Sequence, residues 1–202
     1  MATYAAHTDV SVEKSRVITR YGATAVPYTV SWSGEDQQFV GFCQHAKARA
    51  LCMPSAAGVG KPQFGKPHSN RQREAIAAGL CDLCGKSLRN RTKVSLSHAR
   101  TRMNAAEGPA VLQVEPLLHK ECAAESLKFC PSLKRDIAAG ALMVRQVNRY
   151  RVQFAIMSPV YVKEYVPDYV ANPADRIIGH AKVELLSWLD RSMDWLTEPS
   201  HG

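Results

Sequence analysis

The sequence contains no long hydrophobic run. No window approaches the roughly 18 uninterrupted apolar residues that a membrane-spanning helix needs, and the first residues lack the basic and then apolar layout of a secretory signal. Glycine and proline are near average usage and no period repeats, which excludes collagen-like, low-complexity and repeat proteins. We therefore expect a globular, cytoplasmic protein with no membrane partner.

Several catalytic motifs are also absent. The chain has no glycine-rich phosphate loop followed by Lys and Ser or Thr, no Gly-x-Ser-x-Gly turn and no Rossmann glycine pattern. The zinc-deaminase signature is absent, because Leu80 stands at the position where that signature has proline and no His-x-Glu precedes Leu80. These absences favour a binding protein over an enzyme without deciding between them.

Positive charge is concentrated in one segment. The chain has 26 Lys and Arg against 18 Asp and Glu, a net charge of +8, and residues 61–102 carry this whole excess. Such a segment is typical of a surface that binds nucleic-acid phosphate, DNA more than RNA here; a solvated charged face is the alternative. The residues predicted to contact phosphate are Lys66, Arg71, Arg73, Lys86, Arg89, Arg91, Lys93, Arg100 and Arg102.

The pattern of apolar residues predicts an α+β fold. Alternation and β-branched residues predict strands, which we place twice within 10–33, at 93–98, at 111–114, and in a hairpin of 141–147 and 150–156 with its turn at Asn148-Arg149. Helical spacing predicts helices at 71–78, 119–130 and 132–139, and a C-terminal amphipathic helix over 173–196. A short helix at 44–51 is also possible.

These elements divide the chain into three segments. Residues 1–60 form a β-rich N-terminal segment, residues 61–140 a basic zinc-binding module, and residues 141–202 a hairpin followed by the C-terminal helix. We expect the three to pack as one compact unit, with the zinc module against an antiparallel sheet.

Two pairs of metal-ligand residues stand far apart in the chain. Cys81 and Cys84 flank two residues on a tight turn that Gly85 permits, and His119 and Cys122 repeat this spacing where a helix is predicted to begin. Four nitrogen and sulfur donors in two such pairs suit tetrahedral Zn²⁺. A turn, a β-hairpin and a helix with the second pair make a treble-clef module, so a structural zinc site is predicted.

The remaining cysteines and histidines leave alternatives open. Cys130 could replace His119 as a ligand, although helical geometry would turn it about 80° away from Cys122. Cys43, His45 and Cys52 offer three donors without a fourth, which is more typical of core residues than of a second zinc site. His68 could reach a ligand, but a histidine in such a loop is more often solvated or caps the next helix.

The order of these motifs resembles a known set of proteins. The segments that carry the resemblance are Val26–Ser33, Gly60–His68 with Arg71–Arg73, Leu80–Gly85, His119–Cys122 and Cys130-Pro131. They look like uncharacterised proteins of actinobacteria and their phages, over residues 26–140. The position of His119 is usually cysteine in that set, which implies that it is a ligand position. No activity is implied.

A second resemblance is to zinc-stapled HNH endonucleases. His98 stands fourteen residues after Cys84, at the end of a predicted strand, where those enzymes carry the general base. The sequence departs from them at Ser97, which replaces an acidic metal ligand, and at Ala123, which replaces a common asparagine. No further histidine follows on the helix, so nothing evident would hold a catalytic cation.

Three functions follow from the sequence. The leading hypothesis is a zinc-stabilised nucleic-acid-binding or regulatory protein, encoded by a phage. The first alternative is an HNH-like, metal-dependent endonuclease with His98 as its base. The second is a protein-protein adaptor or inhibitor of a host enzyme, whose basic face meets an acidic protein surface.

Overall fold

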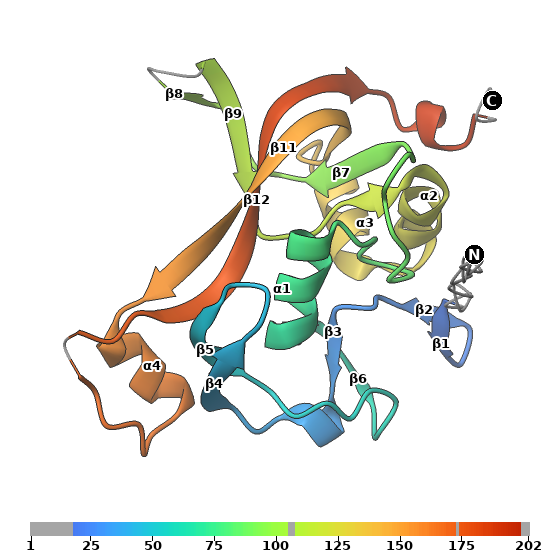
Figure 1. The fold of residues 1–202 in the computed structure, drawn as a ribbon. Coiled ribbons are helices and arrows are strands. Elements are labelled where there is room, and N and C mark those ends of the chain that lie inside the picture. Colours follow the sequence, from blue (N-terminus) through green and yellow to red (C-terminus); the bar gives the residue numbers. More distant parts are fainter. Residues whose placement is uncertain (1–17, 105–107, 173, 199–202) are drawn as a thin grey trace, which may run out of the picture.

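Two long antiparallel strands form the centre of the protein. The structure is a computed structural model that describes residues 18–104, 108–172 and 174–198. In it, β11 (Met143–Met157) and β12 (Ile177–Arg191) share twelve residue pairs. They run as a curved ribbon across the molecule, from α4 at the lower left to the upper right (Figure 1).

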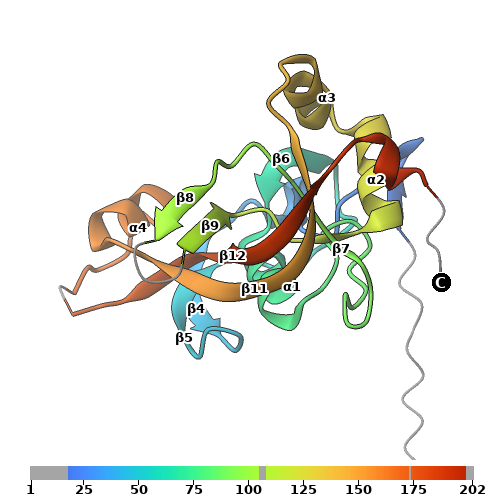
Figure 2. The ribbon, with the colours of Figure 1, turned by 90° about the horizontal axis from the view of Figure 1, so that it is seen from above.

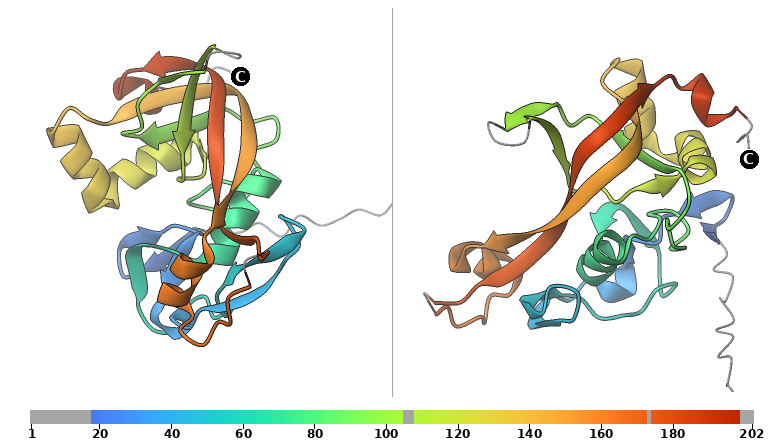
Figure 3. Two further views of the ribbon diagram at one scale, coloured as in Figure 1. Left: turned by 90° about the vertical axis from the view of Figure 1, so that its left-hand side faces the viewer. Right: turned by 45° about the horizontal axis from the view of Figure 1, so that its top comes forward.

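Six further strands extend this ribbon into a curled sheet. Next to β11 lie β7 (Lys93–Ser97) and then β10 (Leu118–His119). Next to β12 lie β5 (Ala48–Cys52) with β4 (Phe39–Cys43), and β9 (Gly108–Gln113) with β8 (Arg102–Asn104). Strands from all three predicted segments therefore share one sheet, whose bend is visible in Figure 3.

Two smaller strand pairs and four α-helices complete the described part of the chain. The pairs are β1 (Thr19–Tyr21) with β2 (Thr24–Val26), and β3 (Val30–Trp32) with β6 (Pro62–Pro67). The helices are α1 (Ser69–Ala78), α2 (Lys120–Phe129), α3 (Pro131–Ala138) and α4 (Pro159–Tyr165), with short 3-10 turns η1 (Ser33–Glu35) and η2 (Asp194–Leu196). Helices α2 and α3 lie at one end and α4 at the other (Figure 2).

The α+β class is confirmed, as are the predicted helices that correspond to α1, α2 and α3. None of the described helices has the length and apolar character that a membrane span requires. The strands predicted between residues 10 and 33 are found from residue 19 onward as β1, β2 and β3. The part of that prediction before residue 18 lies outside the described residues.

A side chain of helix α1 forms hydrogen bonds with the sheet at the point where the strand next to β12 changes from β5 to β9. Along β12 the neighbour is β5 at Ile178 and β9 at Val183. Between these points, Gln72 Nε2 donates to the carbonyl oxygens of Val114 and Ala181 at 2.8 Å each, and its Oε1 accepts from the Ala181 amide at 3.0 Å. A side-chain amide of α1 thus bonds to the backbone of β12 and to the residue that follows β9.

A buried ion pair joins α1 to the N-terminal part of the chain. Arg71 donates from Nη1 and Nη2 to the Glu35 carboxylate at 2.7 Å each, and Glu35 is fully buried. Burial alone would raise the pKa of Glu35, but hydrogen bonds from Arg71 and from the Ala56 and Trp32 amides outweigh it and lower the pKa to about 2. His68 caps α1, since its Nδ1 accepts from the Arg71 amide.

The predicted C-terminal helix is wrong, because residues 177–191 form β12. Leu185 and Leu189 are four residues apart, a spacing that places them on one face of a helix and on one face of a strand alike. The strand forms and the helix does not because β12 pairs with β11 along its whole length. β-Branched residues such as Ile177 and Val183 also favour a strand.

Two further sequence predictions are corrected. The predicted hairpin at 141–156 is the single strand β11, because Asn148 occupies a β-bulge and not a turn. Val147 pairs with Trp188 and Arg149 with Ser187, which leaves Asn148 as the extra residue of its strand. The possible helix at 44–51 is a turn followed by β5, which pairs with β4.

Glu35→Gln should lower the free energy of unfolding by about 3–5 kcal/mol, because it leaves a buried guanidinium without its counter-charge. Urea unfolding followed by tryptophan fluorescence would measure this. Asp36→Asn is a matched control, since the Asp36 carboxylate pairs with Lys66 at 2.8 Å at the surface and is screened by water. An equal loss in the two variants would contradict the assigned role of the buried pair.

Glu35 should also make stability depend on pH. Its pKa is lower in the folded protein than in the unfolded chain, so its contribution is complete above about pH 5 and is lost as the pH falls towards 2. The parent protein should therefore lose stability more steeply than Glu35→Gln over this window. Urea unfolding at several pH values would measure this. If the free energy of unfolding falls equally steeply with pH in the parent and in Glu35→Gln, Glu35 is not the source of the pH dependence.

Candidate metal centre

The four residues predicted to bind a metal lie together. One ligand atom from each of Cys81, Cys84, His119 and Cys122 lies within 4.8 Å of the others. His119 Nδ1 is 3.4 Å from Cys84 Sγ and 3.9 Å from Cys122 Sγ. Tetrahedral coordination with zinc-like bond lengths would place neighbouring donors about 3.6–3.8 Å apart. The cluster could therefore hold a metal ion.

The first ligand pair sits on a tight turn closed by backbone hydrogen bonds. The Gly85 amide donates to the Cys81 carbonyl and the Cys81 amide donates to the Lys86 carbonyl, both at 2.8 Å. Gly85 has a φ of 65°, the left-handed conformation that glycine adopts without strain. The turn folds back beneath the sulfurs, and both Cys81 and Cys84 are buried in the main core.

The second pair is placed by the start of α2. His119 ends β10 and is the N-cap of α2, which puts Cys122 in the first helical turn. The positive end of the helix dipole there favours a thiolate. Strand β10 pairs with β7, so the sheet fixes the point at which this helix begins.

The orientation of His119 suits coordination through Nδ1. Its Nε2 lies 3.0 Å from the carbonyl oxygen of Ser87. A carbonyl can only accept, so Nε2 carries the proton, and in the neutral ring Nδ1 then has a free lone pair directed at the sulfurs. Such an outer hydrogen bond is the usual support of a metal-binding histidine.

Hydrogen bonds among the thiols and the imidazole shift the pKa values of these groups. The pKa of Cys84 is lowered, first by hydrogen bonds from the Cys122 and Cys81 thiols. The pKa of His119 is raised to about 10 by its hydrogen bonds to the Cys81 and Cys84 sulfurs, and the pKa of Cys122 is raised because its thiol donates to the same sulfurs. A bound cation would take the place of the protons in these hydrogen bonds.

The alternative ligands do not join this cluster. Cys130 lies past the end of α2, at the N-cap of α3. Cys43 and Cys52 are buried in a separate apolar cluster with Ala50, while His45 is exposed. Throughout residues 18–104, 108–172 and 174–198, no second group of three or more His, Cys, Asp or Glu side chains is arranged to hold a metal.

Two of the predicted phosphate contacts are wrong. Arg71 is bound to Glu35, and Arg73 is completely buried with Nη1 donating to the Gly179 carbonyl at 2.6 Å. Neither guanidinium can reach an external phosphate. A charged side chain is expected to be exposed when only the sequence is known. The Glu35 carboxylate and the Gly179 carbonyl, which bind these two guanidinium groups, lie 36 and 106 residues away in the chain.

The other predicted basic residues lie at the surface. Lys66 is half exposed and pairs with Asp36. The side chains that are exposed and form no ion pair within the described part of the chain are Lys86, Arg89, Arg91, Arg100 and Arg102. Lys93 is partly buried at the start of β7, with its Nζ 3.4 Å from the Arg91 carbonyl. Exposed positive side chains therefore follow the metal-binding turn along the chain, before and after β7.

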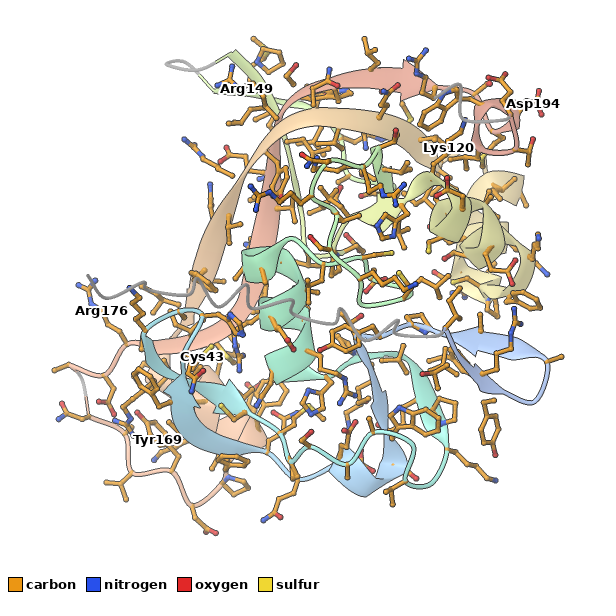
Figure 4. The ribbon with its side chains drawn as sticks, turned by 45° about the vertical axis from the view of Figure 1, so that its right-hand side comes forward. Cys43, Lys120, Arg149, Tyr169, Arg176 and Asp194 are labelled. Atoms are coloured by element: carbon orange, nitrogen blue, oxygen red, sulfur yellow. The ribbon has the colours of Figure 1, made fainter. Side chains whose placement is uncertain are left out.

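Two further exposed arginines lie on β11 and β12, outside the segment predicted from the sequence to bind phosphate. Arg149 is exposed and lies at the upper rim of the molecule, far from Tyr169 (Figure 4). Arg191 is exposed as well and donates from Nε and Nη2 to Gln146 Oε1 at 3.0 and 2.7 Å. The sequence favours a hairpin turn at Asn148-Arg149, so it gives no indication that these two strands carry basic residues of the same kind of surface.

The proposed nuclease base lies away from the cluster. His98 was predicted to end a strand over 93–98, and it lies one residue beyond β7, which ends at Ser97. Its side chain is 70% exposed and its acidic neighbour, Asp136, is 3.7 Å from Nδ1. His98 belongs to no metal-holding group among the described residues. No family model, curated protein or solved structure matches the chain.

The cluster predicts that the folded protein binds one metal ion per chain, which native mass spectrometry before and after chelation would count. Cys84→Ser should abolish this binding, whereas Cys130→Ser, a matched control outside the cluster, should keep it. Chelation should lower the free energy of unfolding by about 4 kcal/mol where free metal had been a thousandfold above Kd. A folded chain that is free of metal would contradict the assignment.

Proposed function

We propose that this protein is a zinc-stabilised nucleic-acid-binding protein that contacts phosphate through the basic surface beside the metal centre. The observation that carries the proposal is the set of exposed Lys and Arg side chains after the metal-binding turn that form no ion pair with any described residue. Each phosphate that such a side chain neutralises releases condensed counterions, which drives binding without base readout. DNA is the first partner to test.

Zinc is the metal that this donor set favours. Three cysteine sulfurs and one imidazole nitrogen form a soft tetrahedral site, and Zn²⁺ imposes no geometric preference of its own. All four positions are filled by protein side chains, which is typical of structural sites. The metal-binding turn, strands β7 to β9 and α2 support a treble-clef interpretation of this region, although β8 pairs with β9 while β7 pairs with β10 and β11.

The metal centre positions the basic surface through two direct connections. His119 Nε2 donates to the carbonyl of Ser87, which lies between the basic residues Lys86 and Arg89. His119 also pairs with Lys93 in the register of β10 and β7. Zinc bound at Nδ1 of this histidine would therefore fix both ends of the loop that carries the positive charge.

Replacing Lys86, Arg89 and Arg100 by alanine together should weaken DNA binding and reduce the dependence of log Kd on log salt by about 0.9 for each phosphate that is no longer neutralised. Fluorescence anisotropy with a labelled duplex, a single strand and an RNA of the same sequence, at salt concentrations from about 50 to 200 mM, would measure both. Affinity should fall about equally for unrelated sequences.

The matched control replaces Lys47, Lys163 and Arg176, three exposed basic residues that lie outside the basic segment 61–102. It removes the same formal charge but should leave the salt slope unchanged. Equal weakening in both triple variants would indicate a general charge effect. No salt-dependent binding by the zinc-loaded parent would overturn the proposal in favour of an acidic protein partner.

A further inference from the structure

A pocket lies between the end of the basic loop and the bulged strand β11. Its volume is 430 Å³, within the usual range for small-molecule sites. Its lining consists of one valine and six polar residues, which are Asn90, Arg91, Thr92, Lys93, Gln146 and Asn148. Strand β7 pairs with β11 from Lys93 onward, opposite Val147, so the sheet fixes the two walls of the pocket to one another.

The chemistry of this lining selects an anion that also carries hydrogen-bonding groups. It offers two cations, three carboxamides and one hydroxyl, and no carboxylate. A metal cation would find no charged ligand here, whereas a phosphate would meet Arg91 and Lys93. The carboxamides of Asn and Gln present a donor and an acceptor side by side, the arrangement that matches the edge of a nucleobase.

The backbone places these amides in the pocket. Asn148 is the extra residue of the β-bulge, and a bulge redirects a side chain out of the regular alternation of a strand. Asn90 has a φ of 56°, a left-handed conformation that asparagine tolerates, and the Arg91 amide closes the turn by donating to the Leu88 carbonyl at 3.2 Å. Leu88 is buried in the core and anchors the loop.

Gln146 is held with its amide nitrogen available. Its Oε1 accepts two hydrogen bonds from Arg191, whose guanidinium also lies 5.4 Å over the Trp195 ring. Within the described part of the chain, Gln146 Nε2 has no protein partner. Arg191 therefore fixes the orientation of this amide so that its donors remain for a ligand.

We propose that the pocket is a nucleotide subsite, in which Arg91 and Lys93 hold one phosphate and the carboxamides of Gln146 and Asn148 bind the edge of one base. This rests on the proposed function, which supplies the nucleic acid whose exposed nucleotide would enter. A nucleotide in a single strand or at a strand end fits, because its base edge is not engaged in pairing.

Isothermal titration of the zinc-loaded protein with the four deoxynucleoside 5′-monophosphates, their nucleosides and inorganic phosphate tests the subsite. At least one monophosphate should bind about fivefold or more tightly than inorganic phosphate and than its own nucleoside, as expected when base and phosphate contacts act together. A nucleotide that binds no more tightly than inorganic phosphate would overturn the inference.

Variants separate the two kinds of contact. Asn148→Ala should remove the preference for nucleotide over phosphate while phosphate still binds, and Arg91→Ala should weaken both. Lys163→Ala, remote from the pocket, should change neither. Unchanged nucleotide binding in both Asn148→Ala and Arg91→Ala would place the ligand elsewhere and refute the subsite.

The outcomes also separate this inference from the proposed function. DNA binding that depends on Lys86, Arg89 and Arg100, without binding of any mononucleotide, would leave the basic surface intact and refute the subsite alone. Mononucleotide binding at the pocket with no salt-dependent binding of DNA would refute the proposed function and keep a nucleotide site. Failure of both titrations would refute both.

Discussion

Three sulfurs and one imidazole nitrogen meet inside the main core, although Cys84 and His119 are separated by 35 residues of chain. The surrounding structure depends on this convergence. It joins the turn after α1 to the start of α2, and the chain between the two contributes β7, β8 and β9 to the sheet. A link that closes a loop of this length removes many conformations from the unfolded chain, so a bound ion would stabilise the packing well beyond its four ligands.

The parts of the structure that could be predicted from sequence are those fixed by local chemistry. The spacing of Cys81, Cys84, His119 and Cys122 identified the cluster, and capping and turn signals identified α1, which ends at Gly79 with a φ of 63°. The long strand β12 could not be predicted, because its apolar spacing also fits a helix and only pairing with β11 resolves the choice. Long-range pairing leaves no local signature.

Burial of charge escaped prediction for the same reason. Arg71 and Arg73 stand in the most basic segment of the chain, yet their partners are Glu35, far upstream, and the Gly179 carbonyl, far downstream. With Arg71 and Arg73 buried, the exposed positive charge comes from other side chains of the basic segment, whose exposure was predicted correctly. Arg149 and Arg191 add to it, from strands that the sequence did not predict correctly. Counting charges along the sequence therefore identified the basic segment, but it could not identify which of its side chains are buried or which basic residues outside it are exposed.

The contact of Gln72 with the sheet has a mechanical consequence. Strand β5 pairs with β12 at Ile178 and β9 pairs with it from Val183, and the Gln72 carboxamide bonds to Ala181 of β12 and to Val114, which follows β9. Strands β5 and β9 can therefore leave β12 in different directions, and the Gln72 amide bonds to β12 between the points where they pair with it. A side chain without both a donor and an acceptor could not make this set of hydrogen bonds.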